Sequence, residues 1–217
     1  MNYKLFLKFL INIGDLTLPG KKAHNKMSPP ERDINIQFQP NNTNFKEAAV
    51  LILVYPSFNG NPCIALIERS DYVGVHSGQI SFPGGRFEFS DNSFWDTAIR
   101  ETAEEIGIDN SVIKFLKEMS MVYIPPSNFK VFPFIGYVDK KPLFKLDKNE
   151  VKSIIELPIS DLLRENNKAK KSIITSYMRK VTVPMYIFED NYVWGATAMI
   201  LSEFELLILD VLNKKNI

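Results

Sequence analysis

Apolar residues along the chain fall into short continuous runs, which predict strands, and into wider-spaced patterns, which predict helices. Residues 48–55 are apolar throughout, as is typical of a strand buried on both faces. A turn at 56–62 leads into a returning strand at 63–68. Further strands are expected at 79–82, 119–123, 129–138, 181–188 and 192–194, the last two forming a hairpin.

Helical patterns are interleaved with these strands. They predict one helix over residues 93–106, a short helix within 156–163 and a final helix over 197–213. The polar stretch 166–172 carries three lysines and is expected to be a solvated loop. Strands alternating with helices predict an α/β arrangement, in which helices cover a sheet.

The N-terminal segment has a different pattern of residues. Phe6, Phe9, Leu10 and Ile13 recur at helical spacing, so we expect a short amphipathic helix that ends near Gly14 and docks on the domain. A signal or membrane-surface helix is the alternative. Residues 19–44 are polar and rich in Pro, Asn and Lys, which predicts a linker or an extended arm. We therefore divide the chain into an N-terminal helix and arm, 1–44, and a main domain, 45–217.

Composition narrows the class of protein. With 26 Lys and Arg against 25 Asp and Glu, the chain lacks the basic excess of a general nucleic-acid binder. A single cysteine, Cys63, excludes an internal disulfide framework. No apolar run approaches the ~20 residues of a membrane span. We expect a cytoplasmic protein that does not bind membranes, and the sequence leaves its oligomeric state open, a homodimer included.

The predicted helix over 93–106 has two chemically opposite faces. Ser93 is a suitable N-cap, and Gly107 stands where a helix commonly stops. One face should pack on the sheet through Trp95, Ile99, Thr102 and Ile106. The other face carries Glu101, Glu104 and Glu105.

Three carboxylates on one patch repel each other, and Arg100, four residues before Glu104, offsets only part of this repulsion. A hard divalent cation seeks such a set of oxygen ligands and leaves positions for phosphate and water. A solvated acidic face is the alternative. Gly84 and Gly85, between a strand and the helix, let the backbone approach a ligand or metal closely, which favours the functional interpretation.

These positions together resemble the Nudix hydrolases, whose signature is a glycine, a helix bearing REXXEE and a closing glycine. The matching residues are Gly85, Arg100, Glu101, Glu104, Glu105 and Gly107. The spacing from Gly85 to Arg100 is one residue longer than usual, and Asp91 substitutes for the early glutamate, which is usually a structural partner. The resemblance implies a Nudix-type α/β/α sandwich with a mixed β-sheet.

Other segments resemble the coenzyme A diphosphatase branch of this family. They are residues 66–70, Gly78, 82–85, 133–136, 149–151, 157–158 and 193–198. The branch pattern has an arginine where this chain has Gly74. The implied reaction is hydrolysis of coenzyme A, or its thioesters, to 3′,5′-adenosine bisphosphate and 4′-phosphopantetheine.

The resemblance also implies roles for individual residues. Glu101 and Glu105 would be the principal ligands of Mg²⁺ or Mn²⁺, with Glu104 as a further ligand or the proton acceptor. A backbone carbonyl of Gly84 or Gly85 would complete the shell, and Arg100 would orient the glutamates. Substrate contacts are expected from Arg69, Arg86 and His76, and Glu150 is a candidate distal base. The alternatives are that Arg69 and Arg86 form surface ion pairs, that His76 caps a turn and that Glu150 is a solvated acid.

Two other functions stay open at this point. Gly74 motivates a Nudix diphosphatase that acts on ADP-ribose or another nucleoside diphosphate derivative. A catalytically silent module that binds a nucleotide is the other, although a binding module has no need of mutually repelling carboxylates. In each case the partner is a small molecule.

Overall fold

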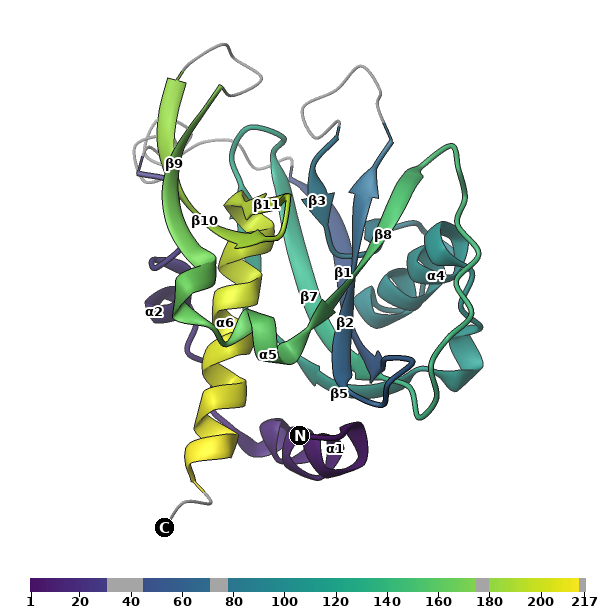
Figure 1. Cartoon of the computed structure of the whole chain (residues 1–217). Helices are drawn as coiled ribbons and strands as arrows, with labels where there is room; N and C mark the ends of the chain where they lie inside the picture. Colours follow the sequence, from purple (N-terminus) through teal and green to yellow (C-terminus); the bar gives the residue numbers. More distant parts are fainter. Residues whose placement is uncertain (31–44, 71–77, 175–179, 215–217) are drawn as a thin grey trace.

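The computed structural model describes residues 1–30, 45–70, 78–174 and 180–214, and its centre is a mixed sheet (Figure 1). Strand β1 (Lys46–Pro56) runs antiparallel to β2 (Pro62–Arg69) and parallel to β7 (Phe129–Tyr137). The main path of the sheet is β3-β2-β1-β7-β5. Its shorter or outer strands are β3 (Ile80–Ser81), β4 (Gly84–Arg86), β5 (Lys114–Glu118), β6 (Val122–Ile124) and β8 (Val151–Pro158).

Helices cover both faces of this sheet, because β1 presents apolar side chains to each side in turn. Leu51 and Leu53 belong to the core under α4 (Phe94–Ile106), whereas Ile52 and Val54 belong to the core under α6 (Gly195–Asn213). All four are fully buried. The α/β fold with a mixed sheet between helices is thus confirmed.

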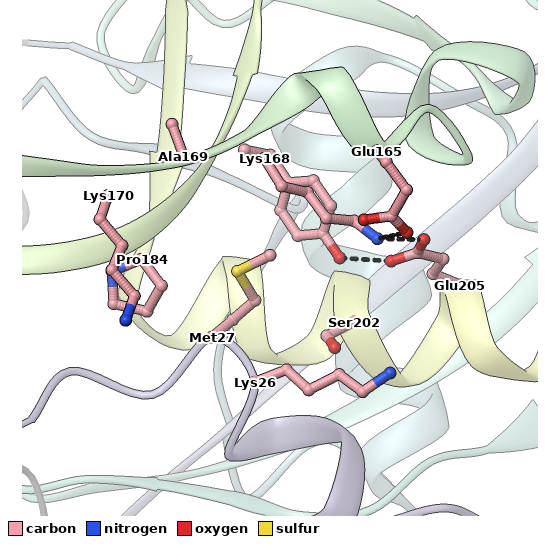
Figure 2. A pocket seen from close by; sticks show the side chains of 10 residues that line it. Lys26, Met27, Glu165, Lys168, Ala169, Lys170, Pro184, Ser202 and Glu205 are labelled. Atoms are coloured by element: carbon pink, nitrogen blue, oxygen red, sulfur yellow. Dashed lines mark hydrogen bonds and ion pairs between the residues drawn. The ribbon is translucent and has the colours of Figure 1, made fainter.

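A second sheet of three strands lies beside α6. It is formed by β9 (Lys168–Ile174), β10 (Lys180–Phe188) and β11 (Asn191–Trp194), all antiparallel. The hairpin of β10 and β11 was expected, but the prediction of a solvated loop at 166–172 is wrong. Its lysines lie on the edge strand β9. Lys168 pairs with Glu165 and Glu205, and Glu205 also accepts a hydrogen bond from the Tyr186 hydroxyl (Figure 2).

The N-terminal helix docks on the domain, as predicted. Helix α1 (Tyr3–Leu10) continues into the 3-10 turn η1 (Ile11–Asp15) and buries Phe6, Leu10 and Ile13 beside α6. The Tyr3 hydroxyl donates to the Val138 carbonyl at 2.7 Å. No helix among the described residues is both long and apolar enough to span a membrane.

The expectation of a linker or extended arm at 19–44 is wrong for its described part, which ends at Pro30. Residues Lys21–His24 form the short helix α2, and His24 is buried against Glu203 of α6 at 3.2 Å. The polar composition of this segment led to the wrong prediction. The segment is buried against Glu203, which is itself polar and lies far along the chain. Residues 31–44 lie outside the described part.

One further strand prediction was wrong in detail, and one strand was not expected. The segment 119–123 is not one strand, because β5 ends at Glu118 and β6 begins at Val122. The unexpected strand is β8, which pairs with β2 and ends within 156–163, just before the short helix expected there. The remaining short elements are η2 (Asn110–Val112), α5 (Ile159–Leu162) and η3 (Glu165–Asn167).

Candidate active site

Helix α4 forms where its end signals predict. The Ser93 Oγ accepts the Asp96 backbone N–H at 3.2 Å, and Gly107 takes the left-handed conformation with φ of 73°. Ala98, Thr102 and Ile106 are buried against the sheet. The helix therefore has a fixed orientation, and its remaining side carries the three glutamates over β4.

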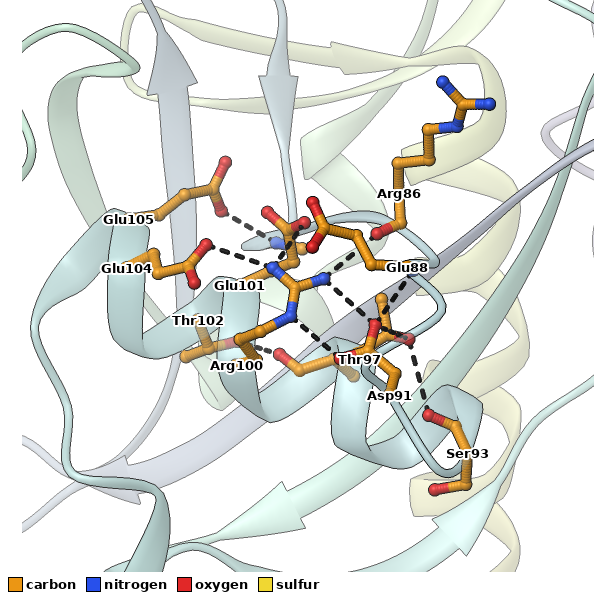
Figure 3. A network of polar contacts seen from close by, with 12 residues as sticks. Arg86, Glu88, Asp91, Ser93, Thr97, Arg100, Glu101, Thr102, Glu104 and Glu105 are labelled. Atoms are coloured by element: carbon orange, nitrogen blue, oxygen red, sulfur yellow. Dashed lines mark hydrogen bonds and ion pairs between the residues drawn. The ribbon is translucent and has the colours of Figure 1, made fainter.

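Arg100 is the hub of a polar network on that side (Figure 3). Its Nη1 donates to Glu101 Oε1 at 3.0 Å and to Glu104 Oε2 at 3.1 Å. Its Nε and Nη2 donate to the two carboxylate oxygens of Asp91 at 2.9 and 3.0 Å. Nη2 also donates to the Arg86 carbonyl at 3.1 Å. One guanidinium therefore sets the positions of two glutamates and of the loop before the helix.

Asp91 is held from several directions. Besides Arg100, the Thr97 hydroxyl donates to it at 2.8 Å and the Glu88 backbone N–H at 3.1 Å. The Arg100 guanidinium lowers the pKa of Asp91 to about 2. The Glu88 and Thr97 donors act in the same direction, and partial burial opposes them. Asp91 is thus a structural partner of Arg100, as the resemblance implies for the early acid, and the longer loop after Gly85 accommodates it.

Glu105 is almost completely buried, at 1% exposure, yet few donors reach it. The Gly84 backbone N–H donates to Oε2 at 2.7 Å, and Arg69 Nη1 lies 3.4 Å from Oε1. Burial raises the pKa of Glu105 to about 8, although Gly84 and Arg69 act in the opposite direction. Burial also raises the pKa of Glu101, against the influence of Arg100.

The two glycines allow this close packing. A Cβ on Gly85 would lie 2.3 Å from the Glu101 carboxylate, and a Cβ on Gly84 would lie 2.3 Å from the Ala49 carbonyl oxygen. Gly84 also has φ of 142°, which L side chains rarely adopt. The backbone at Gly84 and Gly85 does approach other protein groups closely, whereas its approach to a ligand or metal stays a prediction. The groups approached are the carboxylates of Glu101 and Glu105.

A loop that sequence reasoning did not connect to the helix closes the C-terminal end of α4. The Lys145 N–H donates to the Ile106 carbonyl at 2.9 Å, and the Asp147 N–H donates to the Glu105 carbonyl at 3.0 Å. The same loop carries Glu150, whose negative charge raises the pKa of both Glu101 and Glu105. The polar residues Asp-Lys-Asn-Glu at 147–150 indicate a turn in the sequence. Their spacing does not reveal that this turn packs on the end of α4.

The three residues predicted to contact the substrate do not lie together. Arg69 faces Glu105, as described. The side chain of Arg86 is exposed and extends away from the Arg100 network in Figure 3. His76 lies outside the described residues.

The carboxylates fit a divalent cation chemically, though not as a preformed cluster. Among the residues that the structure describes, no three Asp, Glu, His or Cys side chains stand together as a metal site. Arg100 holds Glu101 and Glu104, while Glu105 turns toward Gly84. Glu101 and Glu105 nevertheless supply hard oxygen donors beside a glycine backbone. Burial disfavours their ionised form, so the protein itself leaves these carboxylates without full compensation of their charge.

Comparison with known proteins agrees with this arrangement. Residues 45–177 match the NUDIX domain family model. The chain is 32% identical over 160 residues to the uncharacterized Nudix hydrolase NudL of Yersinia enterocolitica, covering 73% of this chain and 79% of that protein. NudL of Citrobacter koseri is 32% identical over 171 residues, covering 76% and 84%.

Among solved structures, a MutT/nudix family protein from Enterococcus faecalis aligns with a TM-score of 0.51 at 16% identity, covering 85% of this chain and 75% of that one. This likeness supports the fold. Nudix hydrolases act on nucleoside diphosphate-linked small molecules and generally use divalent ions such as Mg²⁺ or Mn²⁺. The domain match and the relatives agree with the glutamate helix, and this chain belongs to the Nudix hydrolase family.

Proposed function

We propose that this Nudix hydrolase cleaves the diphosphate bond of coenzyme A or its thioesters, releasing 3′,5′-adenosine bisphosphate and 4′-phosphopantetheine. One observation carries the proposal: two segments that resemble the coenzyme A branch meet at the glutamate helix. Arg69, in the first segment, pairs with Glu105 at 3.4 Å. Ser70, beside it, donates its N–H to the carbonyl of Glu150, in the second segment, at 2.9 Å.

In this proposal Glu101 and Glu105, with Glu104 or a Gly84 or Gly85 carbonyl, would hold Mg²⁺ or Mn²⁺. A bound divalent ion neutralises diphosphate oxygens and acidifies a water molecule. Arg100 keeps the Glu101 and Glu104 carboxylates in position through its two Nη1 contacts. Arg69 keeps Glu105 turned toward the glycines.

The remaining residues handle substrate and proton. The exposed Arg86 guanidinium is available to pair with a substrate phosphate. Water attacks one phosphorus, and the bond from that phosphorus to the bridging oxygen breaks. The water proton passes to a carboxylate oxygen of Glu104, which is 59% exposed, or of Glu150.

A substrate panel tests the assignment. Coenzyme A, acetyl-coenzyme A, dephospho-coenzyme A and ADP-ribose are each incubated with Mg²⁺ or Mn²⁺, and products are separated by chromatography. We expect coenzyme A or its thioester to give 3′,5′-adenosine bisphosphate at the highest kcat/KM. Glu118→Gln, an exposed glutamate on β5, serves as the matched control for Glu105→Gln.

Other outcomes have defined meanings. Preference for ADP-ribose or dephospho-coenzyme A would replace the substrate while keeping the chemistry, as Gly74 suggests. Metal binding without hydrolysis of any diphosphate would favour a silent nucleotide-binding module.

A further inference from the structure

Strand β3 carries a buried hydroxyl that has no role in the proposed hydrolysis. The Oγ of Ser81 is buried, and it has no hydrogen-bond partner among the residues that the structure describes. A buried donor without a partner destabilises the folded state, so such a group calls for an explanation. Ser81 stands three residues before Gly84, whose backbone N–H binds the Glu105 carboxylate.

The side chain of Ser81 lies on the α4 face of the main sheet. Ser81 stands opposite Ile67 of β2 in antiparallel register, and directly opposed residues place their side chains on the same face. Ile67 belongs to the core under α4. The two neighbours of Ser81, Ile80 and Phe82, point the other way, into the core under α6. The unpartnered hydroxyl is therefore on the same side of the sheet as the glutamates.

A gap between β1 and β2 brings polar groups from three strands toward Glu105. The two strands pair near the turn that joins them, and beyond these pairs β4 takes the place beside β1 and β3 the place beside β2 (Figure 1). Gly84 of β4 and Arg69 of β2 both contact the Glu105 carboxylate. The Arg69 N–H also donates to the Gln79 carbonyl at 3.1 Å, so Arg69 and Ser81 belong to neighbouring positions of the β2–β3 pair.

The Glu105 carboxylate can accept a further donor. A carboxylate oxygen accepts about two hydrogen bonds. Within the described part of the chain, Oε1 has the Arg69 contact alone, at a long 3.4 Å. A serine side chain has three staggered positions, so its Oγ reaches new acceptors by rotation about a single bond. A hydroxyl without an acceptor and a carboxylate short of donors thus lie in the same region of the α4 face.

We infer that Ser81 is a positioning residue for the metal site, and that its hydroxyl donates to the Glu105 carboxylate when Glu105 holds the divalent ion. The inference rests on the proposed function in one respect, the assignment of Glu105 as a metal ligand. Side chains that hydrogen-bond to metal ligands fix the orientation of those ligands, and losing one typically weakens metal binding about 10–100-fold. The Ser81 hydroxyl then contributes to metal affinity and adds nothing to the stability of the metal-free protein.

Mn²⁺ binding by the metal-free full chain tests the inference without any substrate. The electron paramagnetic resonance signal of free Mn²⁺ measures the Kd. We expect Ser81→Ala to raise this Kd about 10-fold. Ser81→Cys keeps the shape but has a weaker donor, so its Kd should lie between those of the parent and Ser81→Ala.

Urea unfolding without metal supplies the second measurement. Ser81→Ala should lose no unfolding free energy, because the hydroxyl that it removes has no partner in the metal-free protein. Ser127→Ala is the matched control. It removes another buried hydroxyl without a partner in the described structure, in the turn between β6 and β7, and should leave the Kd for Mn²⁺ unchanged.

The inference is overturned if the parent protein does not bind Mn²⁺, if Ser81→Ala leaves the Kd unchanged, or if Ser127→Ala raises the Kd as much. It is also overturned if Ser81→Ala destabilises the metal-free protein, since the hydroxyl would then serve the fold. Failure of the proposed function gives a different result. A protein that prefers ADP-ribose to coenzyme A, yet loses Mn²⁺ affinity with Ser81→Ala, upholds the role of Ser81 and changes the substrate alone.

Discussion

Two buried glutamates lie on opposite faces of the sheet in opposite environments. Glu203 of α6, fully buried, accepts the Ser120 hydroxyl at 2.6 Å, the Gly20 N–H at 2.8 Å, and the Ser120 N–H and His24 Nε2 at 3.2 Å. Burial alone would raise the pKa of Glu203, but these donors hold it below its ordinary value of 4.5. Among the described residues, Glu105 of α4 has one backbone donor and a more distant arginine, and its pKa is raised.

The difference separates structural from functional carboxylates. A buried charge that its own protein satisfies joins parts of the fold, and Glu203 joins the N-terminal segment, α6 and the loop after β5. A buried charge left short of donors costs stability, and strongly perturbed pKa values of this kind cluster at functional sites. Under the proposed function, the divalent cation would supply the positive charge that Glu105 lacks.

The largest expected effect is on catalysis. Glu105→Gln should lower kcat/KM for the best diphosphate substrate about 10³-fold, equivalent to about 4 kcal/mol, because a neutral amide cannot take the role of the carboxylate. Its unfolding free energy in metal-free buffer should not fall, since burial already disfavours the ionised form of Glu105 and a glutamine of the same shape is never ionised. Rates and urea unfolding measured on one preparation check both halves. Retained activity together with lost stability would reverse the assignment.

The opposite pattern is expected at Glu203. Glu203→Gln keeps the shape but turns an NH₂ group toward donors, so the unfolding free energy should fall by about 2–4 kcal/mol. At a temperature where the variant is folded, kcat should stay within about 2-fold of the parent. Urea denaturation measures the first quantity and initial rates the second. A 100-fold loss of kcat in fully folded protein would contradict a purely structural role.

A smaller effect is expected at the network that positions the glutamates. Asp91→Asn removes the charge that holds Arg100, so kcat should fall about 10-fold, equivalent to about 1.4 kcal/mol, with KM little changed. Asp109→Asn, at an exposed aspartate whose side chain accepts hydrogen bonds from Ser111 away from the glutamates, is the matched control. Equal rates for the two variants would show that Arg100 does not need Asp91.

The pH dependence of stability is small for each pH unit, and its sign differs between the two residues. With a native pKa near 8 against 4.5, Glu105 retains a proton in the folded state that the unfolded state releases, so stability falls as pH rises through this window. The contribution of Glu203 is present above pH 4.5 and is lost as pH falls below it.

Urea unfolding across pH without metal checks both signs. Glu105→Gln should remove a slope of at most about 1.4 kcal/mol per pH unit between pH 5 and 8. Glu203→Gln should instead flatten the loss of stability below pH 4.5. Identical pH profiles for the two variants would remove the contrast.

Local signals were enough for much of the site. Ser93 and Gly107 predicted both ends of α4, and the spacing of Arg100 from Glu104 predicted their contact, because these relations span at most a few turns of one helix. The pair Gly84–Gly85 predicted a close backbone approach. The loop that carries Glu150 escaped prediction as a cap of α4, since its two contacts join residues 39 and 42 positions apart.

The sequence by itself determined the helix with its three glutamates, the strand buried on both faces, the docking of α1 and the family. Each depends on periodicity or on residues close together in the chain. Tertiary structure alone decided that His24 is buried against Glu203, that the lysines around Lys170 belong to a strand, and that Arg69 faces Glu105. The physical reason is that a polar side chain is satisfied by whichever partner the fold brings to it, and composition does not reveal that partner.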